Sequence, residues 1–517
     1  MTIRIGWLSD DSLITLRTAL NITSGWGPGF NPSESVQGYT HPLWFMLWTF
    51  SGSLSGQWIV SVLVLSVTFT TFSLVAVMSA PGPRAALPFV FLLLALSNSF
   101  MEYSTSGLEN PLSHCLVGVL VLLLSRQTER GINIGYAVCV GAVSALLFLN
   151  RFDLVLLVGP GLSLWIVRAS WRVRCVSAVS FLLPVAVWMS WSYATYGTVL
   201  PNTFLAKRNL DIDQLELLGQ GLFYLRVSLT HDLAGAALLV TALILGFVST
   251  QRLVAVQVLG IPIYLAYVVS NGGDFMVGRF LSTPIYLAAV SIPILLKSRR
   301  CFPFPAWKLS RVKTRMPANY VVGSIAGLLL LGTLGPSAVS LSRQPYERFD
   351  WQHPNSRGIA DERGFYASRG RGVDFLVREY SLASSGTQCS TGNTTRGCDL
   401  LSPFSIVDIS RQANGWPEKT EKSPLLPRYV EVTCGLLGGN AILSGPQTHW
   451  VDTCGLTDRV MAGITFRPSE KGWRIGHFER EIPPGYLEAV ANNDVSFIVD
   501  PSTRRQVEAV WGSIRRN

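Results

Sequence analysis

The feature that most constrains this chain is a series of long apolar runs, each separated from the next by a short polar loop. Only 14% of the residues are charged, whereas ordinary soluble domains have about 25%. About 20 apolar residues cross a bilayer, and the shorter runs need tight packing or extension at their ends. The pattern predicts about ten membrane spans, near residues 57–78, 84–100, 107–124, 134–149, 153–167, 175–195, 233–250, 253–270, 280–296 and 319–341.

The basic residues of the short loops predict how these spans are oriented. The most basic loop, at residues 297–315, belongs on the cytoplasmic side by the positive-inside rule. The other basic clusters, from Arg84 to Arg252, then fall on the same side. This placement accounts for the net charge of +10 and gives no indication of a nucleic-acid partner. The outer side receives residues 1–56, 101–106, 150–152, 196–232, 271–279 and everything after 341.

Residues 9–56 form the first outer loop in this arrangement. Such a loop needs a preceding helix to reach the outside, and residues 1–8 are too short to span a bilayer and carry no signal peptide. We therefore expect a first helix that is missing from this chain. The alternative is an N-terminus that is translocated without one.

The composition changes after Leu341 to that of a water-soluble domain. We divide the chain into an α-helical, polytopic transmembrane domain at 1–341 and an extracytoplasmic globular domain at 342–517. The second domain is expected to be α/β. Its predicted strands are 429–433 and 496–499, and its predicted helices are 372–380 and 504–514.

Four cysteines lie in this exported domain, where disulfides persist. Four cysteines allow three pairings. We favour Cys389–Cys398 and Cys434–Cys454, because each of these bridges closes a short loop. No Cys/His spacing typical of a zinc site is present.

Asp10 and Asp11 follow Ser9 at the start of a segment with apolar residues on one helical face, as expected of a helix in the membrane interface. In the structural interpretation, Ser9 or Asp10 is the N-cap of that helix. In the functional interpretation, the paired carboxylates hold a divalent cation, or one of them activates a sugar hydroxyl. We take both as candidate catalytic residues, with the cation as the one cofactor considered.

Lys207, Arg208 and Arg279 lie in outer loops, where positive-inside sorting does not explain them. Cations there can hold the phosphate of a lipid-phosphate donor. For Arg279 the alternative is a salt bridge to Asp274. Further polar candidates in the outer loops are His41, Glu109, Asp153, Asn202 and Asp274.

Two of these candidates have a structural alternative of their own. His41 stands among aromatic residues and is equally expected to be buried against them. Asp153 is close enough in sequence to Arg151 to form an ion pair with it.

Large aromatic residues of the exported domain either stack on the sugar rings of a long acceptor or belong to its core, and the core is favoured. These residues are Trp416, Trp450, Trp473 and Tyr486. Arg474, His477, Glu479 and Arg480 are expected to dock this domain over the membrane site.

Six blocks in order resemble the GT-C superfamily of integral-membrane glycosyltransferases, and more closely the actinobacterial terminal β-(1→2)-arabinofuranosyltransferases. No block is decisive alone, but the ordered set extends from residue 10 to residue 486. The blocks are DDSLITLRTALN at 10–21, GYTHPLW at 38–44, GLENPL at 107–112, LPNTFLAK at 200–207, GGDFMVGRFL at 272–281 and WRIGHFEREIPPGY at 473–486.

The resemblance implies a plasma-membrane enzyme whose active site faces the extracytoplasmic side. Such enzymes take arabinofuranose from decaprenyl phosphate and add it to the non-reducing ends of arabinogalactan and lipoarabinomannan. Their acidic motif maps to Asp10 and Asp11. The alternatives are a GT-C transferase with another sugar or acceptor, and a non-catalytic assembly or motility-linked relative. A secondary transporter is the rival outside the family, but the expected midplane charges and paired repeats are not evident.

Overall fold

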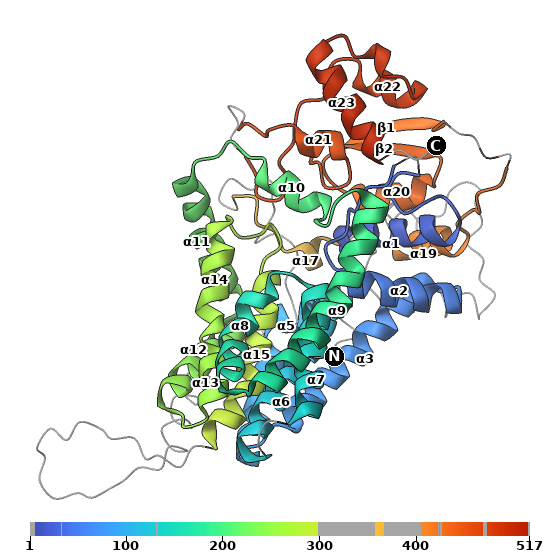
Figure 1. Cartoon of the computed structure of the whole chain (residues 1–517). Helices are drawn as coiled ribbons and strands as arrows, with labels where there is room; N and C mark the ends of the chain where they lie inside the picture. Colours follow the sequence, from blue (N-terminus) through green and yellow to red (C-terminus); the bar gives the residue numbers. More distant parts are fainter. Residues whose placement is uncertain are drawn as a thin grey trace, which may run out of the picture.

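The structure is a computed structural model that describes residues 6–32, 34–130, 133–297, 357–366, 405–421, 423, 426–468 and 473–514. It consists of a helical bundle with a smaller mixed domain stacked on one end (Figure 1). The bundle helices are α3 (Trp58–Met78), α4 (Leu87–Leu96, after the 3-10 turn η1, Arg84–Ala86), α6 (Asn110–Arg130), α7 (Ile134–Asn150), α8 (Leu154–Arg168), α9 (Trp171–Tyr196), α11 (Gln214–His231), α12 (Leu233–Val248), α13 (Arg252–Val258), α14 (Gly260–Ser270) and α15 (Arg279–Leu296).

A helix stands at each predicted span before residue 297, and the span predicted at 319–341 lies outside the described residues. Within the described residues, α3, α9, α13 joined to α14, and α15 are long and apolar enough to cross a bilayer. The pair α11 and α12 would add a fifth crossing, although it is bent by 104°. The remaining apolar helices are shorter, and the chain is a multi-pass membrane protein.

The helices of the bundle differ in how much of their surface is covered. In α15, 83% of the 18-residue apolar segment is buried, while the corresponding share in α9 is 17%. Helix α15 packs against α6 and α12, whereas α9 exposes Leu182, Leu183 and Val187. Helix α15 therefore lies in the interior of the bundle, and α9 lies at its edge.

Helices α1 (Asp10–Thr23) and α2 (Pro42–Ser55) occupy the junction between the bundle and the smaller domain (Figure 1). The Ser9 hydroxyl accepts from the Ser12 amide, which confirms Ser9 as the N-cap of α1. The prediction of a one-faced interfacial helix is wrong, because nearly every residue of α1 is buried. The second face packs on the C-terminal domain, which sequence periodicity could not anticipate.

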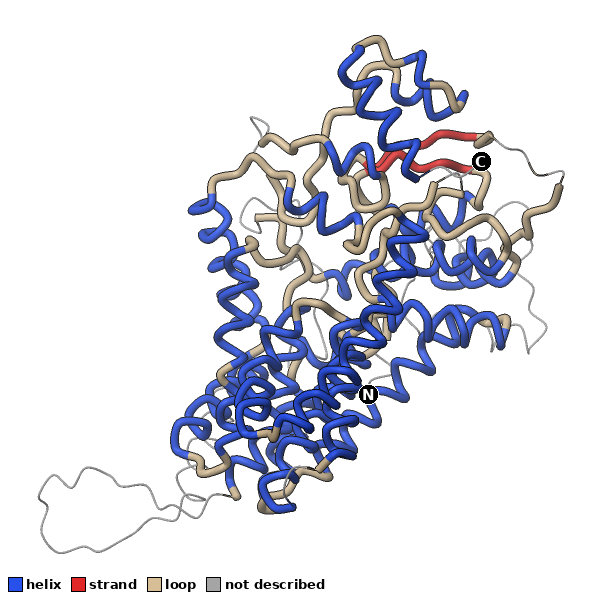
Figure 2. The backbone as a smooth tube through the Cα atoms, in the orientation of Figure 1, coloured by secondary structure: helices blue, strands red, loops and turns tan. Residues whose placement is uncertain are grey.

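The C-terminal domain is built around a two-stranded parallel sheet (Figure 2). Strands β1 (Tyr429–Thr433) and β2 (Thr448–Asp452) pair with Tyr429 opposite Thr448. Parallel strands require a crossover connection, and here it is α20 (Leu437–Ser444). Around this unit lie α19 (Ile406–Asn414), α21 (Arg459–Gly463), α22 (Tyr486–Asn492), the 3-10 turn η5 (Val495–Phe497) and α23 (Pro501–Ile514).

The predictions for this domain had mixed outcomes. The strand at 429–433 and the helix at 504–514 are confirmed. The strand predicted at 496–499 is wrong, because Asp494 accepts from the Ser496 amide and starts the 3-10 turn η5. The helix predicted at 372–380 lies outside the described residues.

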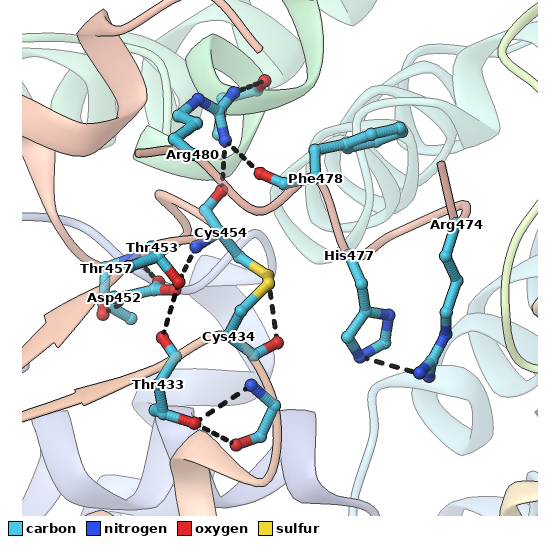
Figure 3. The surroundings of a disulfide bond; sticks show 12 residues. Thr433, Cys434, Asp452, Thr453, Cys454, Thr457, Arg474, His477, Phe478 and Arg480 are labelled. Atoms are coloured by element: carbon cyan, nitrogen blue, oxygen red, sulfur yellow. Dashed lines mark hydrogen bonds between the residues drawn. A yellow bond between two sulfur atoms is a disulfide. The ribbon is translucent and has the colours of Figure 1, made fainter. Parts of the chain in front are cut away.

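A disulfide joins Cys434 to Cys454, as predicted (Figure 3). Each cysteine follows one of the two strands, with Cys434 directly after β1 and Cys454 two residues after β2. The bridge therefore ties the loop that precedes α20 to the end of the sheet. The bridge predicted between Cys389 and Cys398 lies outside the described residues.

Candidate active site

A cavity of about 1120 Å³ lies where the membrane bundle meets the C-terminal domain. Its walls come from both domains, including the loop before α15, the short helix α10 (Asn202–Arg208) and the segment around α17 (Glu362–Tyr366). The lining includes Asp10, Asp11, His41, Lys207 and Arg279 on the bundle side, and Cys434, Asp452, Trp473, Arg474 and His477 on the C-terminal side.

Asp11 and Arg279 form an ion pair at this cavity, with 3.1 Å between Oδ2 and Nη1. Arg279 begins α15, and Gly278 before it has a φ of 75°, a conformation that favours glycine. Asp11 belongs to α1, so the predicted acid and the predicted cation share one face of the molecule. The Arg279 guanidinium also lies 3.7 Å from Asp274 and 4.0 Å from Glu109.

Glu109 lies behind this pair and is buried with other charged groups. Its Oε1 is 3.2 Å from Arg151 Nη1, and its Oε2 is 3.3 Å from His41 Nδ1. Arg151 in turn holds both carboxylate oxygens of Asp153, which confirms the structural alternative for Asp153. Buried charges need such partners, because an unpaired ion in the interior is costly.

His41 connects this buried network to α1. Its Nε2 lies 2.9 Å from the Thr15 hydroxyl, one helical turn beyond Asp11. Burial lowers the pKa of His41 to about 4, so its ring is neutral near neutral pH. A neutral ring with its proton on Nδ1 faces Glu109 and leaves Nε2 to accept from Thr15.

The two adjacent aspartates have different environments. Burial raises the pKa of Asp11 above its usual range, while the nearby Arg279 lowers it in part. The Asp11 side chain keeps 30% of its surface exposed. Asp10 is buried, and its two carboxylate oxygens accept from the backbone amides of Gly438 and Gly439. Both aspartates line the cavity, and Asp11 is the one with the more exposed side chain.

The three candidate phosphate-binding cations do not all reach the cavity. Lys207 lines it and is exposed, and within the described part of the chain it has no ion-pair partner within 4.0 Å. Arg208 is absent from the lining and lies over the ring of Phe204. Asn202 also points elsewhere, since its side-chain amide donates to the carbonyls of Gly455 and Asp458.

The exported aromatic residues divide between core and cavity. Trp416, Trp450 and Tyr486 are buried in hydrophobic clusters, whereas Trp473 lines the cavity. Arg480 donates to the Ala206 carbonyl of α10, and the His477 ring meets the Phe275 ring edge to face. These contacts place His477 and Arg480 against the bundle-side loop and α10, as predicted for these two residues. Arg474 lies beside His477, with 3.4 Å between its Nη2 and the His477 Nε2.

A divalent cation at the acidic pair would be held by Asp10 and Asp11. Across the described ranges no three His, Cys, Asp or Glu side chains gather closely enough to hold a metal ion. The Asp10 carboxylate is also engaged by backbone amides.

Sequence reasoning missed several partners of the acidic motif. Gly438 and Gly439 contribute backbone amides, and no side-chain motif announces such a role. Arg17 is fully buried in α1, and its position as the one charged residue between Asp11 and Glu34 was the available signal. Thr15 carries no comparable signal.

Comparison with known proteins places this chain beside two enzymes. No family model matches it. It is 27% identical, over 92% of its own length and 81% of the relative's, to the terminal beta-(1->2)-arabinofuranosyltransferase of Mycobacterium tuberculosis. It is 28% identical to the enzyme of the same name from Corynebacterium glutamicum, over 56% of this chain and 47% of that relative.

Proposed function

We propose that this protein is a membrane glycosyltransferase that moves an arabinofuranosyl residue from a polyprenyl-phosphate donor to the non-reducing end of a cell-envelope arabinan. The names of the two relatives support the arabinofuranosyl part of this proposal. The observation that carries it is the Asp11–Arg279 pair in a cavity between a membrane bundle and a C-terminal domain.

The donor would reach this cavity from the membrane, with its polyprenyl tail between bundle helices and its phosphate near Lys207 and Arg279. The charge of Arg279 is shared among Asp11, Asp274 and Glu109. Lys207 has no such ion pair within the described residues, so its charge is available to the phosphate. A cation at this position stabilises the negative charge that develops on the leaving group.

Asp11 would serve as the base. Its carboxylate takes the proton from an acceptor hydroxyl, the hydroxyl oxygen bonds to the anomeric carbon, and the bond from that carbon to the phosphate oxygen breaks. A raised pKa suits this role, because a base acts best when its pKa approaches the working pH. Positioning of the two substrates supplies much of the remaining acceleration.

The stereochemistry places a further demand on the site. A β-linked donor and a β-linked product require retention of configuration, whereas a single in-line displacement inverts it. The reaction then proceeds either through a covalent intermediate on a second carboxylate or through attack from the face that the phosphate leaves. The positive-inside rule, applied to the basic loops, supports an extracytoplasmic position for the cavity.

The test is to incubate the purified protein in detergent with polyprenyl-phosphate-arabinofuranose and an arabinan oligosaccharide. We expect extension of the oligosaccharide by one arabinofuranose, and the Asp11→Asn variant should give none. A polyprenyl-phosphate hexose as donor tests the alternative of another sugar. Movement of labelled donor across vesicles without product would instead indicate a transporter.

A further inference from the structure

Helix α20 of the C-terminal domain lacks a cap of its own. The residue at its N-cap, Leu436, has a φ of 52° and offers no side-chain hydrogen bond. The first amides of a helix have no partner within the helix, and the positive end of its dipole lies there. Asp10 of α1 supplies what is missing, at 2.7 Å from the Gly438 amide and 3.0 Å from the Gly439 amide.

The other end of α20 is held by the same helix α1. Arg17 is fully buried, and its guanidinium donates to the carbonyls of Ala441, Gly445 and Thr448. The last carbonyls of a helix are unsatisfied, and a cation near them is favoured by the dipole. An anion and a cation from α1 thus complement the two ends of α20.

The two helices also approach closely between these contacts. A Cβ atom placed on Gly438 would lie 2.2 Å from the Asp10 carbonyl oxygen, so only glycine fits. Ile14 packs in one apolar cluster with Leu437, Ala441 and Trp450. The contact is a tight interface with a fixed register.

This interface determines which way Asp11 points. Successive residues of a helix are about 100° apart around its axis. With Asp10 directed at α20, Asp11 is directed at Arg279 and the cavity. A rotation of α1 would move Asp11 away from Arg279.

We propose that Asp10 and Arg17 form a clip, defined by these two residues and α20, through which the C-terminal domain positions the Asp11 carboxylate. Asp10 is then a positioning residue, and Asp11 alone reacts. This inference rests on the proposed function, and it assigns a different role to each of the two adjacent aspartates.

The test compares Asp10→Asn and Arg17→Gln with a matched control, Arg504→Gln. Arg504 also donates its guanidinium hydrogens to backbone carbonyls of the C-terminal domain, those of Ile498 and Ser496, but it belongs to α23. Two properties are measured in full-length protein. The first is transfer, as kcat and donor KM. The second is the pH dependence of carbodiimide labelling of Asp11, followed by mass spectrometry, which requires no turnover.

We expect kcat to fall about 10- to 100-fold in both clip variants with little change in donor KM, because small displacements of a reacting group are costly. Labelling of Asp11 should accelerate as its pairing with Arg279 loosens. The titration of Asp11 should also move to higher pH in both variants, because the Arg279 charge that lowers its pKa is then farther away. In Asp10→Asn this shift should be smaller, because the loss of the Asp10 charge, the weaker of the two influences, opposes it. Arg504→Gln should lower only the melting temperature.

Two results would overturn the clip. If Asp10→Asn loses transfer as completely as Asp11→Asn while Asp11 labels as in wild type, Asp10 itself reacts. If both clip variants behave like Arg504→Gln in kcat and in labelling, the contact is merely structural. Failure of the proposed function looks different, since wild type would then form no product while labelling would still report on the clip.

Discussion

The two walls of the cavity hold their charged groups in different ways. On the bundle wall, Asp11 is paired with the Arg279 guanidinium, which also lies 4.0 Å from Glu109 behind it. Asp10 is the exception on this wall, because it is held by two backbone amides of the C-terminal domain. On the C-terminal wall, Asp452 accepts from the amides of Cys454 and Thr457, and Arg480 donates to backbone carbonyls (Figure 3). Ion pairs between side chains can exchange partners for a substrate, whereas charges bonded to the backbone are fixed parts of the scaffold. From this difference we expect the bundle wall to carry the reacting groups and the C-terminal wall to hold the shape of the cavity.

The sharpest test of this comparison pairs a carboxylate from each wall. Asp11→Asn should reduce transfer by about 1,000-fold or more, since it removes the proposed base, and should leave the melting temperature nearly unchanged. Asp452→Asn should lower the melting temperature and retain measurable kcat, because its oxygens are satisfied by backbone amides. Thermal melts and initial rates measure both effects. An equal loss of kcat in the two variants would contradict the assignment of different roles to the two walls.

The cations of the two walls allow a second test. Arg279→Lys should reduce kcat about 100-fold, because an ammonium group cannot reproduce the guanidinium geometry beside three carboxylates. Arg480→Lys should lower the melting temperature more than kcat, since its contacts are to four carbonyls around the domain junction. A wild-type rate for Arg279→Lys would remove this residue from the bundle-wall chemistry.

The pH dependence of transfer sharpens the role of Asp11. The base must be ionised, and burial raises its pKa, so activity should decline as pH falls through a value above the usual 3.8. Below that value, kcat/KM should drop about tenfold per pH unit. Arg279→Gln removes a charge that lowers this pKa and should move the acid limb to higher pH. If the acid limb of the pH–rate profile does not move in Arg279→Gln, the group that titrates is not Asp11.

The smallest effect on rate is expected from the disulfide of the C-terminal wall. The Cys434→Ser, Cys454→Ser double variant opens a loop with a sequence separation of 20, and chain entropy predicts a loss of about 3 kcal/mol in unfolding free energy. Chemical denaturation measures this loss. The double variant should still transfer arabinofuranose below its melting temperature. A complete loss of transfer would show that the C-terminal wall contributes to the reaction as well as to stability.

Local patterns in the sequence were enough to predict part of this molecule. The apolar runs predicted the positions of the bundle helices, because membrane insertion depends on composition within one segment. The alternating segment at 429–433 and the N-cap at Ser9 are likewise local signals. For Arg279 and Asp11 the sequence predicted only that both lie on the same side of the membrane. Their ion pair joins residues 268 positions apart, so no local pattern indicates it.

The errors and omissions have a common physical origin in contacts between distant segments. The second buried face of α1 depends on α20, which lies more than 400 residues later and approaches at a glycine. The burial of Glu109 and Arg151 beside His41 depends on the packing of separate helices. Hydropathy also failed to separate α15 from α9, although one is interior and the other peripheral.

The two ends of the clip are seven residues apart in α1, about two turns of helix and about 10 Å along its axis. Loss or gain of one residue between them would swing Arg17 by about 100° relative to Asp10 and carry it off the α20 carbonyls. The contacts of Asp10 and Arg17 with α20 therefore fix the number of residues between them. The spacing of Asp10 and Arg17 in α1 therefore matches the length of α20, although α20 lies more than 400 residues later in the chain.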